Sequence, residues 1–358
     1  MSMRAILITL GDPQTVTGGY LYHRRMAEAA DRHNFAFEFA SVPEGPLTSS
    51  VTAAHRLLRT AEKERVVVVC DSLVAAFLRA SPPPRRSAAV VAMIHQPPGG
   101  MEPGALGRLV RQRLDRAAYR RMDRLIVASE QLRQTFSSEG FGSHSLVVIQ
   151  PGRDAPAQGR IETPVEDLRE GRRVALLCVG NWVRRKQIIE LLEAFSRLPE
   201  GLATLHLVGS DTVDPSYARA VRDRLLPLGS SVVVHGALSR SHVQAMYERA
   251  DIFVLASIQE PYGTVYGEAL AAGLPVIGWR AGNLPYLVTD GLEGLLSEPG
   301  DVSSLAGAIG RMAADEELRK VMGAAARRRG QELPTWEATA AAFFEELHAV
   351  SMNRCGPS

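Results

Sequence analysis

Residues 252–278 read IFVLASIQEPYGTVYGEALAAGLPVIG. The apolar run Ile252–Ala256 predicts a buried strand, and a helical pattern that starts near Thr264 stops at Gly273. Pro275 lies just beyond that glycine, where a helix cannot continue and another apolar run begins. This order of strand, loop, helix and strand is typical of a parallel sheet whose strands are joined by helices.

Two glutamates, Glu260 and Glu268, flank the start of that helix. The first helical turn leaves backbone N–H groups unpaired, here at Gly263, Thr264 and Val265, and with the helix dipole they form a site for an anion. Helical side chains lean toward the N-terminus, so Glu268 points to the same place. A carboxylate accepts hydrogen bonds, and sugar hydroxyls donate them. The junction therefore favours a ligand with phosphate and hydroxyl groups, such as a nucleotide-sugar; two solvated charges are the alternative interpretation.

The composition is that of an ordinary globular protein. The chain has 358 residues, enough for about two domains, with 46% hydrophobic and 22% charged residues. A net charge of +2 does not indicate a nucleic-acid or acidic partner. We expect no membrane span, because no apolar run approaches about 20 residues, and Ala5–Leu10 is too short for a signal peptide. The cysteines Cys70, Cys178 and Cys355 lack disulfide or metal spacing, which predicts a reducing, cytoplasmic location.

Strand and helix patterns alternate along both halves of the chain. Strands are predicted at Arg4–Leu10, Ala36–Ala40, Arg65–Cys70, Ala88–His95, Arg124–Ala128, Leu146–Ile149, Val174–Val179, Thr204–Val208, Val232–His235, Ile252–Ala256 and Pro275–Ile277. Helices between them include Gly19–Arg32, Val51–Glu64 and Ala105–Met122, and a last helix spans Trp336–Val350. A linker rich in proline, glycine and charge covers Pro151–Gly171. This alternation predicts an α/β protein with two doubly wound parallel sheets, each binding ligands outside the carboxyl ends of its strands.

A second phosphate-binding pattern follows the predicted strand ALLCVG, which ends at Gly180. Asn181 comes next, and the run Arg184, Arg185, Lys186 precedes a helix. Only three of the 41 basic residues are lysines, so a lysine at this position is notable. A solvated basic turn is the alternative interpretation.

The spacing of Glu260 and Glu268 resembles the E-x7-E motif of the retaining glycosyltransferases of family 4, which have the GT-B fold: two Rossmann-like domains with an interdomain cleft. The resemblance covers nearly the whole chain and is strongest from about Val174 to Gly300. It implies an acceptor-binding domain at 1–160, joined by the C-terminal helix 336–352, and a nucleotide-sugar-binding domain at 171–335.

The resemblance also implies roles for the residues of the two motifs. Glu268 would contact the nucleotide ribose, Glu260 the transferred sugar, and the Gly263–Val265 amides the diphosphate. Lys186 matches the lysine with which the family grips the diphosphate. Asn181 stands where the family usually has an arginine, so leaving-group stabilisation would be weaker or would come from Arg184 or Arg185.

Four further residues are site candidates by the same resemblance. Gly18 and Gly19 open a helix after the first strand, where glycine lets the backbone approach donor phosphates. His95 ends the predicted strand AVVAMIH and would lie near the transferred sugar. Leu238, after the strand that ends in His235, would contact the nucleotide base. The glycines and the histidine have structural alternatives: two glycines before a helix are common, and a histidine at a strand end is often a satisfied structural residue. Acceptor contacts would come from loops such as Gln96–Pro103.

The segment Leu106–Arg124 is rich in arginine. On a helical wheel most of its arginines lie opposite a stripe of Leu109, Val110, Leu114, Ala117 and Leu125. Some family members use such a helix to reach anionic membranes. Here we expect the stripe to face the core and the arginines to form a solvated face, so a peripheral membrane contact is not favoured.

The sequence thus predicts a retaining, metal-independent glycosyltransferase with His95, Lys186 and Glu260 as its catalytic residues. A UDP-sugar is the donor we expect, with a hydroxyl acceptor; no cofactor is expected, because no Asp-x-Asp metal motif occurs. The alternative is a non-catalytic nucleotide-sugar binder on the same fold, which Asn181 keeps open. A nicotinamide-dependent oxidoreductase is disfavoured, because no GxGxxG follows any predicted strand.

Overall fold

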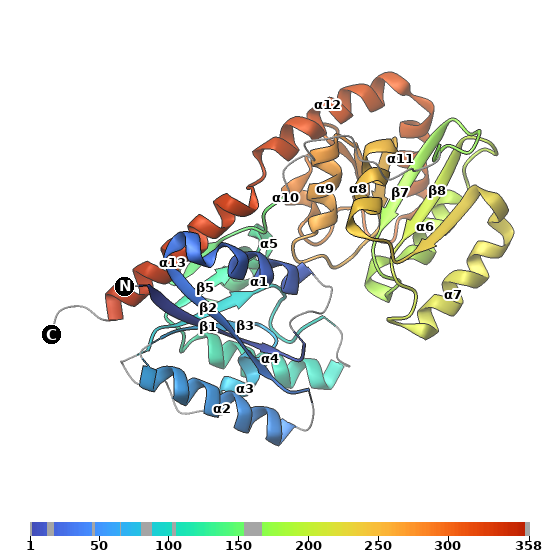
Figure 1. Ribbon diagram of the computed structural model, residues 1–358. Helices are drawn as coiled ribbons and strands as arrows, with labels where there is room; N and C mark the ends of the chain where they lie inside the picture. The colour runs from blue at the N-terminus through green and yellow to red at the C-terminus, as the bar shows by residue number, and fades with distance from the viewer. Residues whose placement is uncertain are drawn as a thin grey trace. The chain divides into compact units, whose positions relative to one another are not determined.

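The computed structural model describes residues 2–12, 18–44, 47–64, 66–79, 88–101, 105–153 and 167–354 (Figure 1). The chain divides into two compact units. The first comprises Met1–Gly152 and Pro334–Ser358, and the second comprises Arg153–Leu333. Residues 154–166 of the predicted linker and residues 102–103 of the predicted acceptor loop lie outside the described residues.

The first unit is built on a parallel sheet of six strands in the order β2-β1-β3-β4-β5-β6. The strands are β1 (Met3–Leu10), β2 (Phe35–Val42), β3 (Val67–Asp71), β4 (Val90–Ile94), β5 (Arg124–Val127) and β6 (Leu146–Val148). Its helices are α1 (Gly18–Ala29), α2 (Leu47–Glu64), α3 (Ala75–Arg79), α4 (Ala105–Tyr119), α5 (Glu130–Ser138) and α13 (Trp336–Arg354), with the 3-10 turn η1 (Ala30–His33).

Alternating side chains of the central strands enter two separate cores in this unit. In β3, Val68 and Cys70 pack under α2 to α5, whereas Val67 and Val69 pack under α1 and α13. Every residue of β3 is buried, as expected for a parallel strand covered on both faces. The C-terminal helix contributes Phe343 and Phe344 to the second of these cores, so it belongs to the first unit although the whole second unit, Arg153–Leu333, lies between it and Gly152.

The second unit repeats the architecture, with strand order β12-β11-β10-β7-β8-β9. The strands are β7 (Val174–Val179), β8 (Ala203–Val208), β9 (Val232–Gly236), β10 (Ile252–Leu255), β11 (Val276–Trp279) and β12 (Gly294–Ser297). The helices are α6 (Ile188–Phe195), α7 (Pro215–Leu225), α8 (Arg240–Arg249), α9 (Thr264–Ala272), α10 (Leu284–Leu287), α11 (Val302–Ala314) and α12 (Glu316–Glu332), with 3-10 turns η2 (Arg184–Lys186) and η3 (Leu226–Ser231).

Two sequence predictions need correction. Strand β12 was not predicted, because GLLS is short and its register is set by pairing with β11 rather than by a pattern of its own. The α4 stripe was assigned to the wrong face: Leu109 and Val110 are 55% and 53% exposed, and Leu114 is 37% exposed. The helix instead buries Asp115, Ala118 and Tyr119, and Leu125 belongs to β5. No helix in the described part of the chain is long and apolar enough to span a bilayer.

Candidate active site

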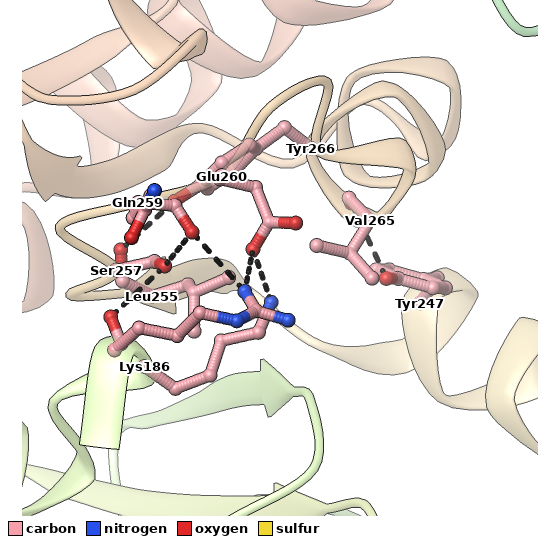
Figure 2. Close-up of polar contacts among 9 residues, drawn as sticks. Lys186, Tyr247, Leu255, Ser257, Gln259, Glu260, Val265 and Tyr266 are labelled. Atoms are coloured by element: carbon pink, nitrogen blue, oxygen red, sulfur yellow. Dashed lines mark hydrogen bonds and ion pairs between the residues drawn. The ribbon is translucent and has the colours of Figure 1, made fainter. Parts of the chain in front are cut away.

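A cluster of charged side chains lies at the carboxyl ends of β7 and β10, which are neighbours in the second sheet (Figure 2). The Lys186 ammonium donates to Oε2 of Glu260, and Arg185 Nη1 lies 3.3 Å from the same oxygen. Both partners of the lysine pair are largely buried, with side-chain exposures of 8% and 13%. Burial opposes ionisation of Glu260, but the two cations outweigh it and lower the pKa of its carboxyl. The site therefore holds a carboxylate between two cations.

Backbone contacts hold the basic turn η2 against the loop after β10. Ile258 N and Ser257 Oγ donate to the carbonyl of Arg185, at 2.9 Å and 3.1 Å. Arg185 Nη1 also donates to Gln259 O at 3.1 Å. These bonds join segments more than 70 residues apart in sequence and position the cations beside Glu260 before any ligand arrives.

The helix after this loop begins at a glycine that no other residue could replace without strain. Gly263 is the N-cap of α9 in the left-handed region, with φ of 81°, and a Cβ there would lie 2.5 Å from Tyr266 Cδ2. Among the residues that the structure describes, no side chain caps the helix. Its first turn, with the amides around Gly263–Val265, directly follows the loop that carries Glu260, which the two cations of η2 contact.

Glu268 lies on α9 in a different environment. It lines a cavity of about 320 Å³ bounded by α8, α9 and α12, together with Arg240, Tyr247 and Arg327. Burial raises the pKa of the Glu268 carboxyl, and Arg240 and Tyr247 only partly oppose that rise. The Tyr247 hydroxyl also donates to Val265 O at 3.2 Å, tying α8 to the first turn of α9 (Figure 2). The loop before α9 thus holds one glutamate that nearby cations favour in its ionised form, and the helix carries another whose ionisation is opposed by burial.

The residues that follow β7 take separate roles. Asn181 Oδ1 accepts from Ser210 N at 3.1 Å, so this side-chain oxygen joins the loops after β7 and β8. Arg184 donates to Ser216 and lies near Asp214, whereas Arg185 lies at Glu260. Of the two arginines offered as substitutes for the cation missing at Asn181, Arg185 is the one that reaches the cluster.

In the first unit, Gly19 and His95 come together at the carboxyl end of the sheet. A Cβ on Gly19 would lie 3.4 Å from His95 Cδ2, so glycine lets the start of α1 approach the imidazole. Gly18 is exposed, with open space where a Cβ would point. In the second unit, Leu238 is partly buried against the core just after β9, which gives it a packing role whatever else it contacts.

Several polar residues of these sites were not singled out from the sequence. They are Thr9, His23, Asp71, Arg240 and Tyr247. Asp71 directly follows the apolar run VVVVC, and His23 lies one helical turn after Gly19 on α1. A polar residue at a strand end and a histidine at i, i+4 from a glycine are weak signals, which become informative only when the strand order is known.

Comparison with known proteins gives the family. Residues 161–329, almost the whole second unit, match the model of the family described as glycosyl transferases group 1. The second unit therefore carries a region of this glycosyltransferase family. The N-acetyl-alpha-D-glucosaminyl L-malate synthase of Bacillus anthracis is 31% identical over 158 residues, which are 42% of this chain and 39% of that protein. The GDP-mannose-dependent alpha-(1-6)-phosphatidylinositol monomannoside mannosyltransferase of Mycolicibacterium smegmatis is 28% identical over 65% of each chain. The chain spans only 25% to 41% of the first four curated relatives it matches.

Solved structures establish the fold. Sucrose-phosphate synthase of Thermosynechococcus elongatus superposes with a TM-score of 0.81 over 97% of this chain and 99% of its own chain, at 23% identity. Anabaena HepE, solved with UDP and glucose, gives a TM-score of 0.78 over 96% and 99% of the two chains at 18% identity. The predicted GT-B fold is confirmed.

Proposed function

We propose that this glycosyltransferase moves a sugar from a nucleoside diphosphate donor to a hydroxyl acceptor with retention of anomeric configuration and without a metal ion. The observation that carries the proposal is the cluster of Lys186, Arg185 and Glu260 beside the uncapped start of α9. Cations and helix amides suit the diphosphate, and the carboxylate suits sugar hydroxyls.

Glu260 can hold the cations and still bind a sugar. Both cations contact Oε2, which leaves Oε1 as an acceptor for a sugar hydroxyl among the contacts of the described residues. An incoming diphosphate would share Lys186 and Arg185 with Oε2 and find them already oriented. Preorganised charge of this kind stabilises a leaving group without reorganisation during the reaction.

In the proposed reaction the bond between the anomeric carbon and the phosphate oxygen breaks, and its electron pair stays on the diphosphate. The acceptor oxygen attacks the same face of the oxocarbenium-like carbon, and its proton passes to the departing phosphate oxygen on that face. Lys186 and the Gly263–Val265 amides take up the developing charge, Glu260 orients the sugar, and Glu268 accepts from the ribose hydroxyls. His95 would lie at the reacting face.

A UDP-sugar is the donor we propose. It is supported by the likeness to Anabaena HepE, which was solved with UDP and with UDP-glucose. The mycolicibacterial relative is named for GDP-mannose, so the base has to be measured directly. The second candidate function is a nucleotide-sugar binder without turnover, which the uncharged Asn181 favours.

Calorimetry with UDP-, GDP- and ADP-glucose and with NAD tests the donor site. We expect one nucleotide-sugar to bind the wild type and its affinity to fall about tenfold or more in Glu268→Ala, because ribose hydroxyls lose their acceptor. Glu193→Ala removes a glutamate of α6 whose side chain is 42% exposed and pairs with Arg197 just after the helix, and this variant should bind as the wild type does. Binding that ignores Glu268, or that appears only with NAD, would contradict the proposal.

Transfer assays with that donor, a panel of hydroxyl acceptors and a chelator test the reaction. Turnover with the anomer retained and with the chelator present supports a metal-independent retaining enzyme. Tight binding without turnover against the whole panel favours the non-catalytic alternative.

A further inference from the structure

A buried polar cluster lies at the carboxyl ends of β1, β3 and β4 in the first unit. The Asp71 carboxylate is 2% exposed and accepts on both oxygens. Oδ1 accepts from Ser72 Oγ at 3.1 Å and from Leu73 N at 3.0 Å, and Oδ2 accepts from Thr9 Oγ1 at 2.8 Å. These donors hold the carboxylate in one orientation, with Oδ2 directed toward α1.

His23 of α1 connects this carboxylate to His95. Its Nδ1 lies 3.7 Å from Asp71 Oδ2, and its Nε2 lies 2.9 Å from His95 Nε2. His23 is 1% exposed, whereas His95 is partly exposed. Burial lowers the pKa of both imidazoles to about 3, and for His95 the neighbouring His23 adds to that effect, so both rings are neutral at pH 7.

Two neutral imidazoles that meet through their Nε2 atoms share a single proton at that contact, because one nitrogen must donate and the other accept. Asp71 decides which ring holds it. A protonated His23 Nδ1 is attracted to the carboxylate oxygen 3.7 Å away, whereas a bare nitrogen there would direct its lone pair at a negative charge. His23 therefore carries its proton on Nδ1, accepts on Nε2, and receives the Nε2–H of His95.

We propose that Asp71, acting through His23, is a positioning residue that fixes His95 as its Nε2–H tautomer and so makes His95 Nδ1 a hydrogen-bond acceptor for a substrate hydroxyl. The tautomer assignment stands on the geometry of the first unit alone; the role toward a substrate hydroxyl rests on the proposed function. A hydroxyl of the donor sugar and a hydroxyl of the acceptor offer the same chemistry, and kinetics separate them.

The tautomers are measured by long-range ¹⁵N–¹H correlation spectra of the full chain labelled with [¹⁵N]histidine. Protonated and bare ring nitrogens resonate in separate ranges, and His23→Gln and His95→Gln variants assign the two rings. We expect a proton on His23 Nδ1 and on His95 Nε2 in the wild type without substrate. A proton on His95 Nδ1, or a mixture of tautomers, would overturn the proposal whether or not the protein transfers sugar.

Asp71→Asn should change the tautomer of both imidazole rings, so that the proton of each moves to its other nitrogen. Leu73 N–H can only donate, so the amide oxygen must stay in the Oδ1 position and the NH₂ group takes the Oδ2 position facing His23 Nδ1. His23 then accepts on Nδ1 and donates from Nε2, and the His95 proton moves to Nδ1. Unchanged tautomers in a folded Asp71→Asn protein would overturn the proposal; if that variant does not fold, the wild-type spectrum still decides.

Asp123→Asn is the matched control. Asp123 also accepts a hydrogen bond from a backbone N–H, that of Val90 at 2.8 Å, but it lies at the amino ends of the strands of the same sheet, away from the cluster. Its histidine spectrum should equal that of the wild type. In transfer assays kcat/KM should fall about 10- to 100-fold in Asp71→Asn, because a donor replaces the acceptor that the hydroxyl needs, and should stay within about twofold of wild type in Asp123→Asn.

A rise in KM for the donor or for the acceptor in Asp71→Asn identifies the substrate that carries the hydroxyl. Full activity with inverted tautomers would overturn the substrate role. Expected tautomers in a protein that transfers no sugar would instead count against the proposed function and leave the tautomer assignment standing.

Discussion

Glu260 and Glu268 are separated by only seven residues, yet their surroundings are opposite. Glu260 lies against Lys186 and Arg185, which lower its pKa in spite of burial. Glu268 lies in the cavity between α8, α9 and α12, where burial raises its pKa although Arg240 and Tyr247 are near. Cations favour the ionised form of Glu260, whereas burial disfavours the ionised form of Glu268. In the proposed function the hydroxyls of a sugar nucleotide would donate to Glu268 and offset that burial, so the two glutamates differ in how much they gain from a ligand.

The largest effect should follow removal of the cation beside Glu260. In Lys186→Ala we expect kcat to fall about 10²- to 10³-fold, because the lysine charge stabilises the departing diphosphate more than the bound donor. Lys320→Ala removes an exposed lysine that pairs with Glu316 and Glu317 on α12, and it should retain activity. Unchanged turnover in Lys186→Ala, measured by steady-state assay, would contradict the assignment of Lys186 as a catalytic residue.

Glu260→Gln should lower stability at pH 7, by about 3 kcal/mol, because two cations lose their buried partner. The folded-state pKa of Glu260 is lowered, so its contribution to stability is fully present above the usual glutamate pKa of 4.5 and is lost as the pH falls through the folded-state pKa. The difference in unfolding free energy between variant and wild type should therefore be smaller at pH 3 than at pH 7. Urea unfolding followed through the buried Trp182 and Trp279 of the second unit measures it. A gap that grows at low pH would contradict this picture.

Glu268→Gln should change the free energy of unfolding in the opposite direction and by a smaller amount. The folded-state pKa of Glu268 is raised, so the stability it contributes is present below the usual glutamate pKa of 4.5 and is lost as the pH rises through the folded-state pKa. At pH 7 we expect the variant to be as stable as the wild type or up to about 1 kcal/mol more stable. The same urea experiment checks it, and a loss as large as that of Glu260→Gln would remove the contrast between the two glutamates.

The sequence predicted the residues of this contrast but not the different surroundings of the two glutamates. The motif predicted both glutamates, the uncapped helix start and the lysine, and the structure brings Lys186 and Glu260 together and leaves the first turn of α9 uncapped. It also predicted two glutamates directed at one place, whereas the structure gives them separate neighbours. The tilt of helical side chains toward the N-terminus sets the direction in which a side chain leaves the backbone. The elements packed around it, here α8 and α12, decide which groups it contacts.

The error at α4 has a related cause. A helical wheel finds an apolar stripe but does not say which face the sheet will cover. In the fold the covered face carries Asp115, whose Oδ2 accepts from Gly99 N at 2.9 Å in the loop after β4. Anchoring that loop requires a carboxylate on the buried face, so Leu109 and Val110 remain exposed.

The sequence by itself determined the order of strands and helices, the glycine at the start of α9 and the residue types of the site. Each depends on interactions within a few neighbouring residues: apolar periodicity, left-handed backbone at glycine, and stop signals after helices. Only the tertiary structure decided the partners, because they are distant in sequence. Lys186 meets Glu260 across 74 positions because β7 and β10 are adjacent in the sheet, and His95 meets His23 across 72 because α1 packs over the end of β4. Strand order is a property of the whole sheet, and it decides which of these groups meet.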